Sequence, residues 1–307
     1  MKKLIADNPK SATDKPRLDQ FLFAKFGTTE SLSKGQIRKL IVAGAVYLNG
    51  VRVRIASKPI FPGSRVEVYL DRERMAEKRV APKIDADSIL YEDDAIIVLN
   101  KPTGLPTQPT VDEARDNLYS QIKTFLRNRG QPELYVGLHH RLDSETSGVI
   151  LFTKSEEANA PIARGFQERT IKKTYVALVE RKKEIPEAFE IQNYLKKRDR
   201  AVGKKAKMFS VHSGGQAALT RFERMPDAKG FSRLMCFPET GRMHQIRAHL
   251  SEYGLPILGD ELYDGESFER IMLHAWKLEF NHPLTGKKVL VEAPLPEDFQ
   301  EDLSKQK

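Results

Sequence analysis

A charged segment in the first third of the chain divides the sequence into two parts that we expect to fold separately. Residues 71–84 are mostly charged, contain a proline and lack the alternation of a strand. Such a stretch buries too little apolar surface to join a core, so we interpret it as a linker, although part of it could be helical. The candidate domains are then residues 17–70 and 85–300, and the polar residues 1–16, which include two prolines, are predicted to form a flexible tail.

Composition places the chain among ordinary globular proteins. Its 307 residues, of which 40% are apolar, suffice for a large core. Cys236 is the only cysteine, which excludes a disulfide within the chain and a zinc site built from cysteines. The first residues lack the apolar stretch of a secretory signal, and no segment is long and apolar enough to cross a bilayer. We therefore expect a cytoplasmic protein without a membrane segment.

The first domain is predicted to contain two helices and a hairpin. An apolar helical face starts at Leu18, and a second helix is expected between Ser33, a good N-terminal cap, and Gly44. Asn49 and Gly50 stand between two short runs rich in valine and leucine, which is a strong hairpin signal. With the segments RLDxFL, LSKGQIRKLI and GAVYLNG, this order resembles the RNA-binding module of a ribosomal small-subunit protein, here called S-four-like.

Positive charge is concentrated in this module. The chain has 51 Lys+Arg and 42 Asp+Glu, a net charge of +9, and residues 17–79 alone carry 13 basic and 6 acidic side chains, a difference of +7. A basic helix face suits RNA phosphates without reading sequence, whereas a face kept charged only for solubility is the alternative. The residues predicted to contact RNA lie off the apolar stripe or on the hairpin: Lys34, Arg38, Lys39 and Arg52.

The second domain holds the most informative stretch, the nonapeptide HRLDSETSG at residues 140–148. It sets a carboxylate beside a guanidinium, and the apolar run at 149–152 that follows is typical of a buried strand. The polar segment is therefore a loop attached directly to the core, which suits a rigid site. Taken alone, Asp143 with Ser144 and Thr146 is more typical of a turn or cap before a strand.

The whole string resembles the signature of RluA-type pseudouridine synthases. Further segments that match this family are YEDDAIIVLNKPTGLPTQP, KTYVA, TGRMHQIRAH, LPILGD and IMLHA, so that the resemblance extends from Arg17 to Pro296. It implies an α+β fold, in which the catalytic domain has a largely antiparallel mixed β-sheet with flanking helices and the small RNA-binding domain adds two helices and a hairpin. The implied activity is isomerisation of uridine to pseudouridine in structured RNA, with no cofactor and no metal.

The resemblance also assigns the catalytic residues. Asp143 is the carboxylate that attacks the sugar or removes a sugar proton, two routes that the sequence leaves open. Arg247 pairs with Asp143 and keeps it charged. Tyr175 stacks on the extruded uracil and recovers part of the cost of flipping the base, about a few kcal/mol; without the resemblance, Tyr175 would be an ordinary core aromatic.

Three more residues are assigned to substrate binding. Arg141 contacts the surroundings of the flipped nucleotide or fills its gap, unless it only forms an ion pair with Asp143 or Glu145. Leu273 closes the pocket, and His140 belongs to the same set. The S-four-like module favours ribosomal RNA of the large subunit over transfer RNA as the substrate. A non-catalytic RNA-binding factor of ribosome assembly is the rival class, which leaves the HRLD, KTY and HQIR segments unexplained; in either case we expect a monomer.

Overall fold

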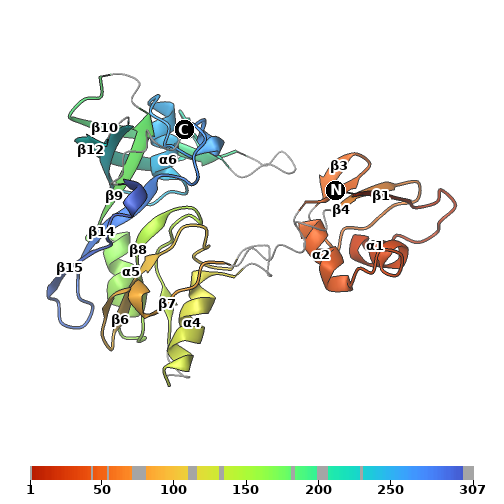
Figure 1. Ribbon diagram of the computed structural model, residues 1–307, viewed down its shortest axis with the longest axis horizontal. Coiled ribbons are helices and arrows are strands. Elements are labelled where there is room, and N and C mark those ends of the chain that lie inside the picture. The colour runs from red at the N-terminus through yellow and green to blue at the C-terminus, as the bar shows by residue number, and fades with distance from the viewer. Residues whose placement is uncertain are drawn as a thin grey trace. The chain divides into compact units, whose positions relative to one another are not determined.

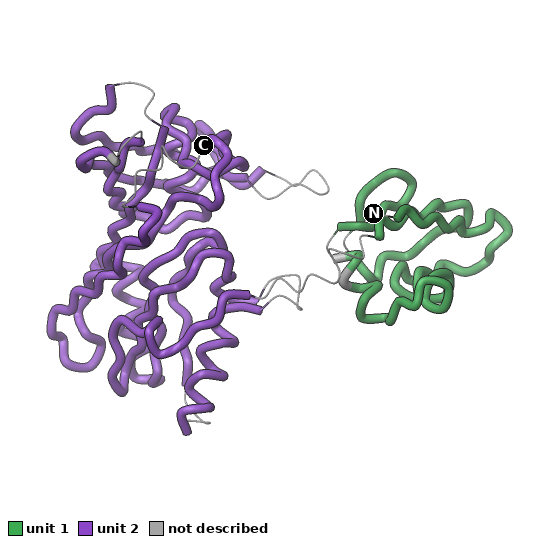
Figure 2. Tube along the Cα trace, in the orientation of Figure 1, with its two compact units in different colours: residues 1–80, 110–115, 199–205 green, residues 81–109, 116–198, 206–307 purple. Residues whose placement is uncertain are grey.

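The computed structural model describes residues 2–42, 44–53, 55–70, 81–109, 116–130, 135–180, 184–198, 207–228 and 231–299. The chain forms two compact units (Figure 2). The described part of the first unit lies between residues 2 and 70, and that of the second between residues 81 and 299. Each unit has a hydrophobic core of its own. Most of the predicted linker, residues 71–80, lies outside the described residues.

A four-stranded antiparallel sheet and two helices form the first unit (Figure 1). The strand order is β1-β4-β2-β3. Apolar side chains from both helices and from the sheet share one core. The elements are β1 (Lys2–Asp7), α1 (Leu18–Phe26), α2 (Lys34–Val42), β2 (Val46–Leu48), β3 (Val51–Val53) and β4 (Arg65–Leu70).

Local signals set the ends of these elements as the sequence predicts. Ser33 caps α2: its Oγ accepts from the N–H of Gln36 at 3.2 Å, and Oε1 of Gln36 accepts from the N–H of Ser33 at 2.8 Å. Asn49 and Gly50 have φ angles of 51° and 79°, the left-handed pair that a two-residue hairpin turn requires. Both helices and the hairpin of the prediction are therefore present.

The predicted flexible tail is wrong for its first residues. Residues 2–7 form β1, which pairs antiparallel with β4 from Lys2–Leu70 to Asp7–Arg65. The strand is short and its sequence is half charged, so its own pattern is weak. Its stability comes from the hydrogen bonds of the β4 edge and from burial of Leu4 and Ala6, both of which are tertiary effects.

The second unit is built on a sheet of eleven described strands. Nine of them follow the order β11-β10-β12-β13-β9-β14-β8-β6-β5, and the other two are β15, which pairs with β14, and β7, which pairs with β8. Among the described strands of this sheet, every pairing is antiparallel except that of β14 with β8, so the predicted α+β class with a largely antiparallel mixed sheet is confirmed. The main elements are β5 (Ile89–Glu92), β6 (Ile96–Lys101), α4 (Leu118–Asn128), β7 (Gly137–Leu138), β8 (Ser147–Thr153), α5 (Asn159–Gln167), β9 (Lys172–Glu180), β10 (Ala188–Lys197), β11 (Met208–Val211), β12 (Gln216–Ala228), β13 (Phe231–Pro238), α6 (Gln245–Glu252), β14 (Leu273–Asn281) and β15 (Lys288–Glu292).

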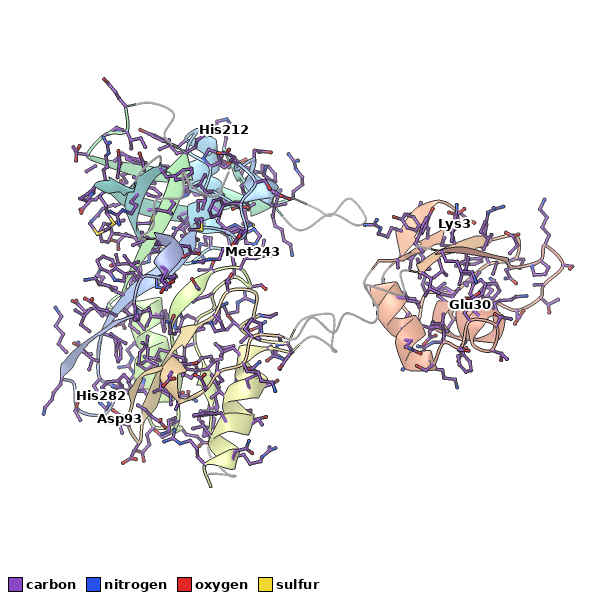
Figure 3. The ribbon with its side chains drawn as sticks, in the orientation of Figure 1. Lys3, Glu30, Asp93, His212, Met243 and His282 are labelled. Atoms are coloured by element: carbon purple, nitrogen blue, oxygen red, sulfur yellow. The ribbon has the colours of Figure 1, made fainter. Side chains whose placement is uncertain are left out.

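Two hydrophobic clusters share this sheet. One joins β6 and β8 to α4 and α5, and the other joins β9 and β13 to α6. Tyr175 on β9 packs against both clusters, so it lies where the two halves of the sheet meet. At the far end of the first half, Nε2 of His282 lies 2.8 Å from Oδ2 of Asp93, which ties the end of β14 to the β5–β6 turn (Figure 3).

Candidate active site

The loop that carries the HRLD motif, residues 139–146, joins β7 to β8 and is fastened to the core. Leu142 is buried, and Oγ1 of Thr107 both donates to its carbonyl at 2.7 Å and accepts from its N–H at 3.2 Å. The N–H of Thr146 donates to the carbonyl of Asp143 at 3.1 Å, which closes a turn. The backbone at Asp143 is therefore held on both sides, and the direction of its side chain is set by rigid structure.

A buried lysine forms a hydrogen bond to the same loop. Lys101, at the end of β6, is fully buried, and its Nζ donates to the carbonyls of Pro102 and Leu105 at 2.8 Å and of Ser144 at 3.1 Å. The sequence shows this residue only as a cation at the end of an apolar run. Its carbonyl partners join the loop after β6 to the motif loop, so Lys101 positions the residue that follows Asp143.

The glycine that ends the motif has a steric reason. Gly148 has a φ of +113°, and a Cβ at this position would collide with the carbonyl of Ala275. The contact arises because β8 and β14 pair in parallel here, with Gly148 opposite Ala275. Only glycine permits both the conformation and the approach, so this part of the motif serves the junction of the two half-sheets.

Asp143 and Arg247 come together as the resemblance implies. Arg247 lies in the first turn of α6, and its Nη1 lies 3.0 Å from Oδ2 of Asp143. The Asp143 side chain is 26% exposed, whereas that of Arg247 is only 4% exposed. A third residue completes the cluster: Asp260 accepts from Nε of Arg247 at 2.6 Å and from its Nη2 at 2.8 Å, and its side chain is 1% exposed.

Arg247 is therefore a bridge between two carboxylates. Burial alone would lower its pKa, but the hydrogen bonds and charge of Asp260, with a contribution from Asp143, raise the pKa of Arg247 above its ordinary value. The guanidinium also lies over the ring of Tyr263, with 5.1 Å from Cζ to the ring centroid. Asp260 and Tyr263 were not among the predicted site residues; the only signal for Asp260 was an acidic residue that ends the apolar segment LPILGD.

His244 joins the cluster from the loop before α6. Its Nδ1 lies 3.1 Å from Oη of Tyr263, which accepts from the N–H of Met208 at 2.7 Å. Because the phenol already accepts from Met208, its own proton is available to Nδ1, an arrangement that favours the His244 proton on Nε2. That nitrogen lies 3.8 Å from Oδ2 of Asp143. Burial lowers the pKa of His244, against the pull of Asp143, so the ring is neutral at neutral pH.

Tyr175 is the third predicted catalytic residue, and it faces the same cluster. On β9 it lies opposite Cys236 of β13 and Ala275 of β14. Burial, and after it the charge of Asp143, raises the pKa of Tyr175, so the side chain remains a neutral phenol. The Asp143 carboxylate thus lies near enough to Tyr175 for its charge to affect the pKa of the phenol. No hydrogen bond to its hydroxyl occurs within the described residues.

The predicted substrate-binding residues have different surroundings. Arg141 is exposed and, within the part of the chain that the structure describes, forms no ion pair with Asp143 or Glu145. Leu273 is buried on β14. His140 is turned into the structure: its Nε2 accepts from the N–H of Leu151 at 3.0 Å, and burial lowers its pKa to about 3. The His140 ring is therefore hydrogen-bonded to the backbone of β8.

The predicted RNA-binding residues of the first unit are only partly free. Lys34 is exposed and lies 5.1 Å from the ring centroid of Phe23. Arg38 donates to the buried Asp19 at 3.0 Å but is itself 60% exposed. Nε of Arg52 donates to Oη of Tyr47 at 2.9 Å. The side chain of Lys39 lies outside the described residues.

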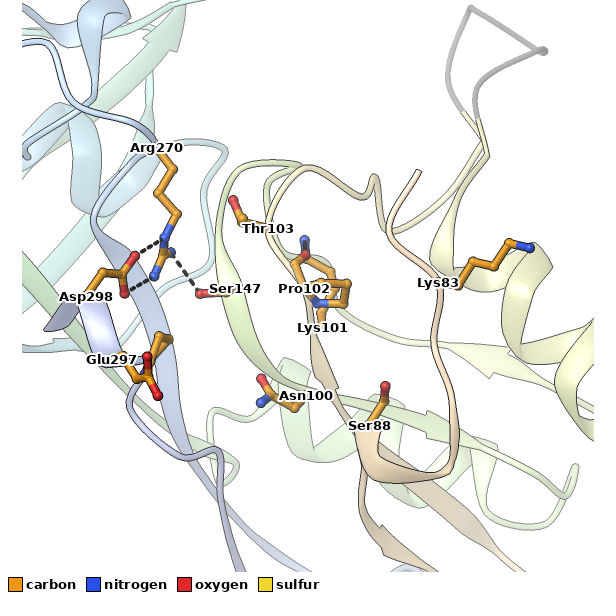
Figure 4. Close-up of a pocket in the computed structure, with 11 residues that line it drawn as sticks. Lys83, Ser88, Asn100, Lys101, Pro102, Thr103, Ser147, Arg270, Glu297 and Asp298 are labelled. Carbon is orange, nitrogen blue, oxygen red and sulfur yellow. Dashed lines mark hydrogen bonds and ion pairs between the residues drawn. The ribbon is translucent and has the colours of Figure 1, made fainter. Parts of the chain in front are cut away.

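A pocket of about 550 Å³ lies beside Ser147, at the start of β8 (Figure 4). Arg270 dominates it: Nε and Nη2 donate to Asp298 at 2.5 and 2.6 Å, and Nη1 donates to Oγ of Ser147 at 3.2 Å. Ser147 in turn lies 2.9 Å from Nδ1 of His274. Asp143 is not among the residues that line this pocket, so the pocket is distinct from the cluster around Asp143.

The fold and the Asp143 cluster define the class of protein. The sequence model of the RNA pseudouridylate synthase family matches residues 95–252, more than half of the chain, and that of the S4 domain matches residues 16–66. The chain therefore belongs to the RNA pseudouridylate synthase family, and it is an RNA pseudouridine synthase, an isomerase.

Individual relatives are similar over most of their length. A Bacillus subtilis (strain 168) protein, the uncharacterized RNA pseudouridine synthase YhcT, is 33% identical over 285 residues, which are 92% of this chain and 91% of the relative. Ribosomal large subunit pseudouridine synthase D of Haemophilus ducreyi is 30% identical over 304 residues, 93% of this chain and 89% of its own. The structure of human RNA pseudouridylate synthase domain containing 1 matches 67% of this chain and 82% of its own, with a TM-score of 0.54 and 27% identity.

Two further observations concern the described residues only. They contain no group of three or more His, Cys, Asp or Glu side chains that could hold a metal ion. None of their helices has the length and apolar character needed to span a membrane.

Proposed function

We propose that this protein converts uridine into pseudouridine in large-subunit ribosomal RNA and that Asp143 carries out the reaction. The observation that carries the proposal is the partly exposed Asp143 carboxylate, 3.0 Å from a buried guanidinium that a second carboxylate holds in place. Two facts support ribosomal RNA: the match to the S4 domain and the relatives named ribosomal large subunit pseudouridine synthase D. Transfer RNA is the alternative substrate.

The geometry suits a carboxylate that must react with a sugar. Arg247 and His244 both approach Oδ2 of Asp143, and Oδ1 has no partner among the described side chains. In the reaction the bond from C1′ to the ring nitrogen breaks, the base turns, a bond from C1′ to a ring carbon forms, and that carbon loses its proton while the nitrogen gains one. Oδ1 is free to attack C1′ or to take a sugar proton, and Arg247 stabilises the charge on the carboxylate.

Tyr175 and Leu273 are proposed to receive the uracil. The neutral phenol of Tyr175 offers a ring face on which an extruded base can stack, and Leu273 is on the adjacent strand β14. Arg141, exposed beside Asp143, is proposed to contact the nucleotides around the flipped base. The exposed cations of the S4 domain, Lys34 and Arg38 among them, would hold RNA phosphates without reading sequence.

Asp143→Asn tests the proposal because it removes the charge and keeps the shape. We expect no tritium release from uridine-labelled RNA and an unchanged affinity for that RNA. The matched control is Glu145→Gln, which removes a charge two residues away in the same loop and should leave the rate within about a factor of 2. A normal rate for Asp143→Asn would refute the assignment, and wild-type protein that binds RNA without ever forming product would support a non-catalytic factor.

Mapping separates the two RNA substrates. Pseudouridine positions are compared in ribosomal and transfer RNA from cells with and without the gene for this protein. Loss of a position from large-subunit ribosomal RNA alone is the expected result. A position lost only from transfer RNA would contradict the choice of substrate and leave the proposed role of Asp143 intact.

A further inference from the structure

The ammonium group of Lys173 has fewer hydrogen-bond partners than it has N–H donors. It lies two residues before Tyr175 on β9, so both side chains leave the same face of the sheet. The Lys173 side chain is partly buried, and its Nζ lies 3.4 Å from the carbonyl oxygen of Thr240, in the loop before α6. No carboxylate of the described residues forms an ion pair with it. One long hydrogen bond to a neutral carbonyl satisfies little of a group with three donors.

The charged residues around Lys173 do not include a carboxylate that pairs with it directly. Arg169 and Lys172 repel it. Glu239 attracts it, but that carboxylate already pairs with Lys172 at 3.7 Å and with Arg221 at 3.8 Å. Lys173 therefore shares its nearby carboxylate with two other cations, an arrangement that is costly for an ammonium group that has lost part of its water.

The remaining neighbours are neutral. The motif loop contributes His140, which its low pKa keeps uncharged, and β9 contributes the phenol of Tyr175. On the adjacent strand β14, the buried Leu278 is paired with Lys173. Burial first, and then the neighbouring cations, lowers the pKa of Lys173 to about 8. The amine is thus mostly charged at neutral pH and would be stabilised by any anion that reached it.

We propose that Lys173 binds a phosphate of the RNA backbone beside the uridine that enters the site. The inference rests on the proposed function, because the entering base is placed on Tyr175. Two residues of a strand span about 7 Å, which is within the reach of one nucleotide from its base to its phosphates. A compact ammonium group matches a phosphate as a point charge, whereas uracil is neutral.

This contact makes RNA binding dependent on pH. The bound phosphate requires the ammonium form, which is lost from the free protein as the pH rises through about 8. Between pH 7.0 and 8.5 the charged fraction falls about fourfold, and RNA affinity should fall about threefold, because the uncharged form still binds weakly. Arginine at this position stays charged over the whole range, so Lys173→Arg should bind RNA without this alkaline decline.

The experiment measures dissociation constants of the full chain for a large-subunit ribosomal RNA transcript at pH 7.0 and 8.5 over a series of salt concentrations. Lys173→Met should weaken binding at pH 7.0 about tenfold and reduce the salt slope by about 1. Lys277→Met is the control: it removes the same charge from β14, opposite Thr174 and hence on the other face of the sheet, and should change neither quantity.

The alternative is that Lys173 only tethers the carbonyl of Thr240. In that case Lys173→Met would lower the melting temperature and leave the affinity and the salt slope unchanged, which would overturn the proposal. An alkaline decline that persists in Lys173→Arg would overturn it as well, since the titrating group would lie elsewhere. These binding results stand apart from product formation, so loss of the proposed catalysis in Asp143→Asn neither produces nor hides them.

Discussion

The substitution Asp260→Asn tests whether a second carboxylate sets the position of Arg247. In the native protein Asp260 takes Nε and Nη2 of Arg247, which leaves Nη1 for Oδ2 of Asp143. Asparagine keeps the shape but has no charge, and it presents an N–H₂ group to a guanidinium that can only donate. We expect Arg247 to turn toward Asp143 and to engage both of its oxygens, including the one proposed to react.

The size of the effect follows from burial. The side chains of Arg247 and Asp260 are 4% and 1% exposed, and removal of one partner of a buried ion pair costs about 3–5 kcal/mol of unfolding free energy. Because Asp143 still compensates part of the charge, we expect a loss near the lower end, about 3 kcal/mol. A shift of the guanidinium by about 1 Å would lower kcat about 100-fold, while KM should change little because the RNA contacts are untouched.

The assay measures kcat and KM by tritium release at a temperature where both proteins are folded, with unfolding followed separately by denaturant. Asp298→Asn is the control, because it breaks a comparable two-point pair with Arg270 whose side chains are 14% and 31% exposed. It should cost less stability and keep kcat. Native kcat in a destabilised Asp260→Asn protein would refute the positioning role, because Asp260 would then contribute to stability without affecting the reaction.

Two further predictions concern stability. Gly148→Ala should cost about 3–5 kcal/mol, from a residue forced to positive φ and from overlap with the carbonyl of Ala275; an unchanged denaturant midpoint would contradict this. His249 and His274 are fully buried, and burial lowers the pKa of each to about 4. Because these folded-state pKa values lie below the unfolded value, about 6.5, the unfolded chain takes up protons first. Stability should thus fall as the pH drops below about 6.5, by about 2 kcal/mol per histidine at pH 5 relative to pH 7.5; equal unfolding free energies at the two pH values would show that these rings are not held neutral.

Local features of this protein could be predicted from sequence because local physics decides them. The cap at Ser33 and the turn at Asn49 each depend on a few neighbouring residues. The helix α5 begins at Asn159, two residues before Pro161, because proline fits only the first turn of a helix. The contact between Asp143 and Arg247 was predicted through the family resemblance, because 104 residues separate them in the chain.

The parts that escaped prediction depend on partners far away in sequence. A buried Lys101 can be understood only with the carbonyl of Ser144, which is 43 residues further on. Asp260 ends the family-matching segment LPILGD, but its role depends on Arg247, which the segment does not reveal. The strand β1 exists because β4 offers it an edge. Each of these depends on tertiary structure that outweighs a weak local pattern.

The charges around Asp143 explain why the proposed reaction would need cations that do not touch this carboxylate. Asp143, Asp260 and Arg247 together carry one net negative charge, and His244 and Tyr175 add none. An RNA phosphate about 10 Å from that charge is repelled by about 0.4–1.7 kcal/mol. Under the proposed mechanism Asp143 must stay charged, so the compensation has to lie around it. On the face from which Tyr175 projects, Lys173 is the cation proposed to supply part of that compensation.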